Sequence, residues 1–137
     1  MNILITGGLG FIGSNFVELL LSKKSIKKIL IVDNFSKSST KYLDTITKYK
    51  MFSSAQSYKS CSSKVQVIKA DINNKEFAFK ITKNIDYIIH LAAESGVDVS
   101  INKPYESFQT NVLGAYNYIE ASRHNNIKRF IFASSGA

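Results

Sequence analysis

The chain has 137 residues, of which 45% are hydrophobic, so it has the length and apolar content of one domain with its own core. Its single cysteine, Cys61, excludes an internal disulfide and favours a reducing compartment. The first apolar run is too short for a signal peptide, and no stretch approaches the ~20 apolar residues that span a bilayer. We therefore expect a soluble, cytoplasmic protein without a membrane partner.

The formal net charge of +8 raises the question of a nucleic-acid partner. The basic residues are scattered, and the densest group is Lys23-Lys24 with Lys27-Lys28. No aromatic residues interleave with this group to form a stacking platform, and cations near a helix C-terminus have a structural reason of their own. The charge pattern therefore does not indicate nucleic-acid binding.

The N-terminal residues have the pattern of a strand, a glycine-rich turn and a helix. An aliphatic run over 2–6 predicts the strand, Gly7-Gly8-Leu9-Gly10-Phe11-Ile12-Gly13 the turn, and an amphipathic stretch over 11–23 the helix. A tight turn, a close approach of backbone to phosphate and close helix packing each favour residues without a Cβ. The pattern predicts a site for the pyrophosphate of a dinucleotide at the N-terminus of the helix.

A second aliphatic run, predicted as a strand over 28–33, ends in Asp33, twenty positions after Gly13. At this spacing a carboxylate accepts hydrogen bonds from the ribose hydroxyls of a bound dinucleotide. The acidic residue favours NAD over NADP, although Lys37 and Lys41 are close enough in sequence to weaken that preference.

The rest of the chain continues this alternation. Further strands are predicted at 65–70, 86–91 and 128–134, and helices near 40–51, 74–83 and 104–124, the last with Pro104 in its first turn. The strands are continuous aliphatic runs, which is typical of a parallel sheet covered on both faces. We expect a doubly wound α/β fold with strand order 3-2-1-4-5, and a mobile serine-rich loop over 53–63.

Three further stretches carry a resemblance to a known family. They are His90-Leu-Ala-Ala-Glu-Ser-Gly-Val-Asp-Val-Ser100, Ser107-Phe-Gln-Thr-Asn-Val-Leu-Gly114 and Phe130-Ile-Phe-Ala-Ser-Ser135. Together with the glycine turn and Asp33, they closely resemble the extended short-chain dehydrogenase/reductase family, in its nucleotide-sugar epimerase and dehydratase branch. The resemblance covers the whole chain in the correct order, and it implies a Rossmann fold with NAD as cofactor.

The resemblance assigns cofactor-binding roles position by position. The pyrophosphate turn would be formed by Gly7, Gly10, Phe11, Ile12 and Gly13. The adenosine ribose would be held by Asp33, Asn34 and Ser36, and the adenine by Asp71 and Ile72. The nicotinamide side would be lined by Leu91, Ala92 and Ala93, and Thr110 would contact a cofactor ribose. Asn111 matches a structural asparagine of the family.

The resemblance also assigns substrate contacts. Ser135 corresponds to the catalytic Ser/Thr that hydrogen-bonds the reacting hydroxyl of the sugar, and Ser95 would lie near the sugar. His90 is expected behind the cofactor as a structural, hydrogen-bonded histidine rather than a catalytic one. Glu94 and Asp98 lack the supporting cluster that a metal site requires, so no metal is expected.

The family mechanism needs a tyrosine phenolate as base, with a lysine four residues later that lowers its pKa. None of the seven tyrosines in this chain has lysine at that spacing. We therefore expect residues 1–137 to be the N-terminal, NAD-binding part of a longer enzyme, inactive alone, with the catalytic helix, further strands and sugar-binding region outside this chain. The fifth predicted strand would then be an unprotected edge.

Two stretches of the sequence bear on the type of reaction. The stretch from Leu91 to Ser100 is similar to the sugar 4,6-dehydratases, but these follow their catalytic Thr with an Asp-Glu pair, where this chain has Gly136-Ala137. We therefore favour a UDP-sugar 4-epimerase, acting by transient oxidation of UDP-glucose or UDP-N-acetylglucosamine. The resemblance implies that the whole enzyme is a homodimer. A 4,6-dehydratase or reductase of the same family and a non-catalytic NAD-binding module remain the alternatives.

Overall fold

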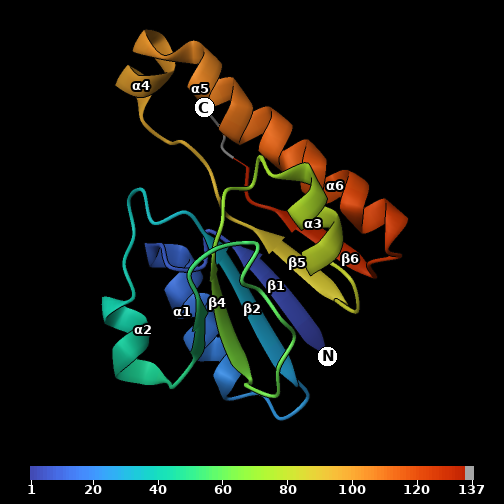
Figure 1. Cartoon of the computed structure of the whole chain (residues 1–137). Helices are drawn as coiled ribbons and strands as arrows, with labels where there is room; N and C mark the ends of the chain where they lie inside the picture. Colours follow the sequence, from blue (N-terminus) through green and yellow to red (C-terminus); the bar gives the residue numbers. More distant parts are fainter. Residues whose placement is uncertain (135–137) are drawn as a thin grey trace.

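The structure, a computed structural model, describes residues 1–134. A parallel sheet forms its centre, with strand order β3-β4-β2-β1-β5-β6 (Figure 1). The strands are β1 (Asn2–Thr6), β2 (Lys28–Asp33), β3 (Lys50–Phe52), β4 (Val65–Lys69), β5 (Tyr87–His90) and β6 (Arg129–Phe132). All of them run in the same direction, so their carboxyl ends lie along one edge of the sheet.

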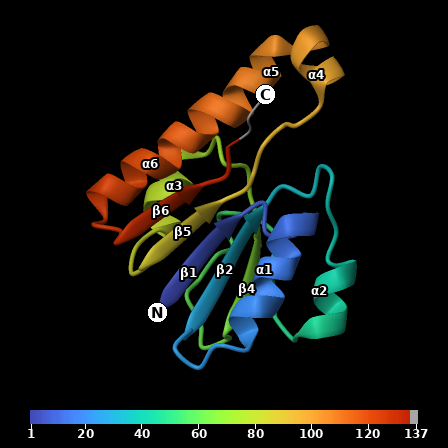
Figure 2. The ribbon, with the colours of Figure 1, turned by 180° about the vertical axis from the view of Figure 1, so that it is seen from behind.

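Helices cover both faces of this sheet (Figures 1 and 2). On one face lie α1 (Phe11–Leu21) and α2 (Lys41–Ile46), and on the other lie α3 (Lys75–Ile81) and α6 (Ala115–His124). A further segment, made of α4 (Val97–Asn102), α5 (Pro104–Phe108) and the π-helical turn η1 (Gln109–Gly114), leads into α6. The helices α4 and α5 lie beyond the carboxyl edge of the strands (Figure 1).

The core consists of one apolar layer on each face of the sheet. Successive strand residues point to opposite faces, so Leu4 packs in the layer that includes Tyr118 of α6, and Ile5 packs in the layer that includes Val17 of α1. All four side chains are completely buried. This explains why the strands are continuous apolar runs rather than alternating ones, because both faces are covered.

The predicted fold class and the strand order 3-2-1-4-5 are confirmed, and the structure adds the short outer strand β3. The helix predicted over 40–51 is wrong beyond Ile46, because Thr47 turns to an extended backbone with φ −162° and ψ 157°. Residues 50–52 then pair with β4, and Phe52 becomes buried. Within the serine-rich segment Tyr58 packs against the Phe52 ring with centroids 5.2 Å apart, so this loop contributes to the core.

The helix predicted over 104–124 is present, but the turn η1 interrupts its α-helical hydrogen bonding. In that turn Gly114 packs so closely on Ile72 that an added Cβ would lie 2.5 Å from the Ile72 Cδ1 atom. Helix α4 was not predicted, since none of its residues is buried and it therefore has no apolar face toward the core. Within residues 1–134, no helix is long and apolar enough to cross a membrane.

Candidate functional site

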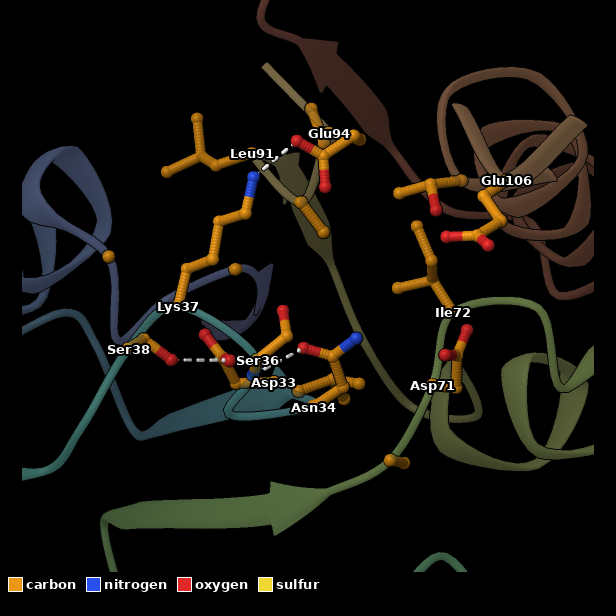
Figure 3. Close-up of a pocket in the computed structure, with 17 residues that line it drawn as sticks. Asp33, Asn34, Ser36, Lys37, Ser38, Asp71, Ile72, Leu91, Glu94 and Glu106 are labelled. Carbon is orange, nitrogen blue, oxygen red and sulfur yellow. Dashed lines mark hydrogen bonds and ion pairs between the residues drawn. The ribbon is translucent and has the colours of Figure 1, made fainter. Parts of the chain in front are cut away.

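A cavity of about 330 Å³ opens at the carboxyl ends of β1, β2, β4 and β5 (Figure 3). In open α/β sheets ligands bind at this edge, where the strand order reverses. Most of the predicted site residues meet here. Those that line the cavity are Gly7, Gly10, Asp33, Asn34, Ser36, Asp71, Ile72, Leu91, Ala92, Ala93 and Thr110.

The glycines of the N-terminal turn serve different physical purposes. Gly7 has a positive φ of 67°, and an added Cβ would lie 2.7 Å from the backbone nitrogen of Ala92. Gly13 sits beneath the turn, where a Cβ would approach the Gly7 carbonyl oxygen to 2.6 Å. At Gly10 the only close atom among the described residues is that same oxygen, at 3.3 Å. Gly7 and Gly13 are therefore required by packing, whereas Gly10 presents bare backbone to the cavity.

Phe11 and Ile12 do not line the cavity with their side chains, which are 88% and 60% exposed. They form the first turn of α1, which begins directly after Gly10. The first N–H groups of a helix have no partner within the helix and lie at the positive end of its dipole. Any contribution of Phe11 and Ile12 to an anion site therefore comes from their backbone amides.

Asp33 lies at the end of β2 and is buried, with 8% of its surface exposed. Its Oδ2 atom accepts a hydrogen bond from the Leu9 amide at 3.1 Å, and its Oδ1 atom accepts bonds from the Phe35 amide at 3.0 Å and the Ser38 hydroxyl at 2.7 Å. The carboxylate thus ties the glycine turn to the loop after β2. The Ser38 hydroxyl is the one side-chain donor in this set, and a ligand hydroxyl could take its place.

The Asp71–Ile72 pair lines the cavity from the connection after β4. The Asp71 Oδ1 atom accepts from the Asn73 amide at 2.8 Å, while the Ile72 side chain is buried. Asn117 of α6 donates to the Ile72 carbonyl oxygen at 3.2 Å and so fixes this connection against the helix. The pair therefore presents an acceptor and an apolar surface side by side, which suits a heteroaromatic ring.

Thr6 at the end of β1 positions the opposite wall. Its carbonyl oxygen accepts from the Leu91 amide at 3.0 Å, and its hydroxyl oxygen accepts from the Ala92 amide at 3.3 Å. Together with the close approach of Gly7 to Ala92, these bonds fix the chain after β5 directly beside the glycine turn.

His90 lies behind this wall and is 1% exposed. Its Nδ1 atom shares a 2.9 Å hydrogen bond with the Thr6 hydroxyl, and its ring stacks on Phe130 and Phe132. Burial lowers the pKa of His90 to about 4, so the ring is neutral near pH 7. His90 does not line the cavity, and its contacts fit a structural role.

The cavity also contains residues that the sequence did not assign to it. Lys37 forms an ion pair with Glu94 across the cavity, and Ser38 and Glu106 lie in its wall (Figure 3). The hydrogen bond from Lys37 is the main reason why the pKa of Glu94 is lowered. No signal in the sequence pairs Lys37 with Glu94, because folding alone brings these two loops together. Within residues 1–134 no group of three or more His, Cys, Asp or Glu side chains is placed to hold a metal ion.

Two further predicted site residues are Ser95, which the structure describes, and Ser135, which it does not. Ser95 is exposed on the connection between β5 and α4 and does not line the cavity. Ser135 lies outside the described residues, so its predicted catalytic role stays a prediction. Asn111 takes a structural place, since its side chain exchanges hydrogen bonds of 2.8 and 2.9 Å with the backbone of Glu94.

Comparison with known proteins identifies a family. The model of the GDP-mannose 4,6 dehydratase family matches residues 4–137. Among curated proteins, the UDP-glucose 4-epimerase of Yersinia enterocolitica is 34% identical over 137 residues, covering 98% of this chain and 37% of that protein. This chain spans only 34–40% of the length of the curated relatives that it matches.

Solved structures agree with this result. The UDP-glucose 4-epimerase of Thermus thermophilus, in complex with NAD, has a TM-score of 0.78 at 29% identity, covering 99% of this chain and 38% of that one. A dTDP-glucose 4,6-dehydratase from Streptomyces venezuelae, also with NAD bound, has a TM-score of 0.77 at 25% identity, covering 95% of this chain and 38% of that one.

Proposed function

Because this chain belongs to the extended short-chain dehydrogenase/reductase family, in its nucleotide-sugar epimerase and dehydratase branch, we propose that its cavity binds NAD and that the whole protein is a UDP-sugar 4-epimerase. The observation that carries the cofactor assignment is the convergence of three elements on one cavity. These are the bare backbone at Gly10, the carboxylate of Asp33 and the pair Asp71–Ile72. Each suits a different part of a dinucleotide.

The proposed arrangement follows the cavity from β4 to β5. The adenine lies against Ile72, with Asp71 accepting from its exocyclic amine, and the adenosine ribose lies at Asp33, with Asn34 and Ser36 beside it. The diphosphate crosses the backbone of Gly7 and Gly10 at the N-terminus of α1, where amides and helix dipole favour an anion. The nicotinamide side is lined by Leu91, Ala92 and Ala93, with Thr110 near a cofactor ribose.

The carboxylate at Asp33 supports NAD rather than NADP. A 2′-phosphate at this position would face a buried negative charge, and both anions would be poorly hydrated there. A ribose diol, in contrast, can donate hydrogen bonds to the carboxylate. Such charge-assisted bonds are stronger than bonds between neutral groups.

Bound NAD supplies hydride acceptance and return at a sugar carbon. In this scheme residues 1–137 hold and orient the coenzyme, and Ser135 hydrogen-bonds the reacting hydroxyl. The proton is removed by a tyrosine assisted by lysine, which this chain does not contain at the required spacing. We therefore propose that the chain is the NAD-binding part of the enzyme and does not turn over a sugar by itself.

The reaction type rests on the residues after Ser135. An epimerase needs no further acid and base. The 4,6-dehydratases have an Asp-Glu pair after their catalytic Thr, whereas this chain has Gly136-Ala137 after Ser135. A dehydratase is the second candidate, because the stretch from Leu91 to Ser100 is similar to those enzymes and dTDP-glucose 4,6-dehydratases are among the relatives, at 27% identity for that of Mycolicibacterium smegmatis. We propose the epimerase first.

The partner in the assembly is proposed to be a second copy of the protein. Supporting this, the helices from α4 to α6 carry large apolar side chains that are exposed in the single chain, among them Val97, Ile101, Tyr105, Tyr116 and Ile119. Sedimentation equilibrium of the whole protein tests the dimer, and a monomer at micromolar concentration would contradict it.

Two experiments test the proposal at separate levels. Isothermal titration calorimetry of this chain with NAD and NADP tests the cofactor, and we expect saturable binding of NAD with weaker binding of NADP. Absence of NAD binding by folded protein, with folding checked by circular dichroism, would refute the cofactor assignment. Product analysis of the whole protein with UDP-glucose and UDP-N-acetylglucosamine tests the reaction, and we expect the 4-epimers. In a parallel assay with dTDP-glucose, a 4-keto-6-deoxy product would instead identify a dehydratase.

A further inference from the structure

The charges that line the cavity are unequal. Among the described residues, its wall carries four carboxylates, Asp33, Asp71, Glu94 and Glu106, and a single cationic side chain, Lys37. The proposed ligand adds two negative charges through its diphosphate. Lys37 is therefore the one side chain of the described wall that can neutralise an anion, and every other charge in that wall repels it.

Lys37 is already engaged by Glu94. The two residues come from the loops after β2 and after β5, and β1 lies between these strands in the sheet. The ion pair, which Figure 3 shows, therefore joins two loops that lie on either side of the carboxyl end of β1, where the glycine turn begins. This is the region through which the proposed diphosphate would run.

Of the two partners, Glu94 is the more firmly held. Its backbone N–H donates to the Asn111 side chain and its carbonyl oxygen accepts from it, while its Oε1 atom also accepts from the Gly96 amide at 3.1 Å. Its side chain is only 19% exposed, whereas that of Lys37 is 56% exposed. Lys37 is thus the partner that can leave, and a long, flexible lysine side chain can do so without moving the wall.

We propose that Lys37 exchanges partners when the coenzyme binds: its ammonium group leaves Glu94 and binds the diphosphate. Glu94 then acts as a built-in competitor that lowers the affinity for the coenzyme. The inference rests on the proposed NAD site. A lysine–carboxylate pair whose ammonium group is exposed is weak because water screens it. A bond to a diphosphate held over bare amides is stronger, so the exchange is favourable.

The exchange predicts effects of opposite sign. Titration calorimetry with NAD should show roughly tenfold weaker binding for Lys37→Gln, the size expected for one charge-assisted bond. Glu94→Gln should instead bind NAD several-fold more tightly, because the ammonium is then free. In the double variant most of the gain from Glu94→Gln should vanish, which identifies the effect as passing through Lys37.

Matched variants separate this pairing from a general change in charge. Lys41→Gln removes the same charge on the exposed start of α2, outside the cavity, and should leave NAD binding unchanged. Glu106 lies in the same wall but pairs with Lys103 instead of Lys37. Glu106→Gln should therefore not reproduce the tighter NAD binding of Glu94→Gln. Adenosine, which has no diphosphate, should bind wild type and Lys37→Gln equally.

Several results would overturn the exchange. Equal affinity of wild type and Lys37→Gln for NAD would remove Lys37 from the diphosphate site. Weaker NAD binding by Glu94→Gln would make Glu94 a positioning residue rather than a competitor. An effect of Lys37→Gln on NADP alone would place its ammonium at the ribose. If wild type binds no NAD at all, the proposed function fails instead, and the two failures are therefore distinguishable.

Discussion

Gly7 and Gly10 allow the packing requirement and the binding requirement of the turn to be measured separately. At Gly7 an alanine would adopt a left-handed backbone at φ 67°, which costs about 1–2 kcal/mol for a residue with a Cβ. Its methyl group would also lie 2.7–2.9 Å from backbone atoms of Leu91 and Ala92, which cannot move like a flexible side chain. Overpacking of this kind costs about 1–3 kcal/mol. Gly7→Ala should therefore lower the free energy of unfolding by roughly 2–5 kcal/mol.

Gly10→Ala is the matched comparison, because it adds the same methyl group three residues away. There φ is −69°, and the nearest atom is the Gly7 carbonyl oxygen at 3.3 Å. We expect a loss of less than about 1 kcal/mol in unfolding free energy, mainly from the altered N-cap of α1. Because Gly10 lines the cavity, its methyl group should nevertheless weaken NAD binding roughly tenfold or more.

Urea denaturation followed by circular dichroism measures the stability of both variants, and titration calorimetry measures their affinity for NAD. The reasoning is refuted if Gly7→Ala is as stable as wild type. It is equally refuted if Gly10→Ala binds NAD normally.

The other predictions concern single polar groups. Asp33→Asn keeps the shape of the side chain but loses its charge, so calorimetry should show NAD affinity reduced by about 1–3 kcal/mol, and full affinity would exclude a contact with the ribose. His90 has a folded-state pKa of about 4, below its usual value of 6.5, so the unfolded chain binds more protons between these values. Stability should therefore fall as the pH drops from 6.5 to 4, by roughly 2–3 kcal/mol in urea titrations, and His90→Gln should lack this component of the decline. Among residues 1–134 the buried Tyr118 hydroxyl has no hydrogen-bond partner, so Tyr118→Phe should leave the thermal midpoint unchanged or raise it. A clear loss of thermal stability would contradict this and show that the hydroxyl makes a stabilising bond.

Much of the fold can be predicted from local patterns in the sequence. The strand before Gly7 and the helix after Gly10 have apolar patterns strong enough to be predicted from their own residues. The position of Asp33 follows from its distance to Gly13. The strand order follows from general rules of connection, and β6 lies at the edge of the sheet as expected.

The features that could not be predicted depend on contacts between distant segments. Strand β3 pairs with β4, which buries Phe52. Tyr58 packs on the Phe52 ring from a loop whose serines indicated only mobility. The pairing of Lys37 with Glu94 joins residues 57 positions apart on two loops. No local periodicity encodes such contacts. The bond from the Leu9 amide to Asp33, across 24 positions, could not be predicted for the same reason.

A crystal structure of the protein grown with NAD tests the central claim most directly. We expect electron density for the coenzyme in the cavity, with the diphosphate over Gly7 and Gly10, a ribose hydroxyl bonded to Asp33 and the adenine against Ile72. Density for NAD at any other place on the chain, or a cavity without the coenzyme at saturating concentration, would contradict the account.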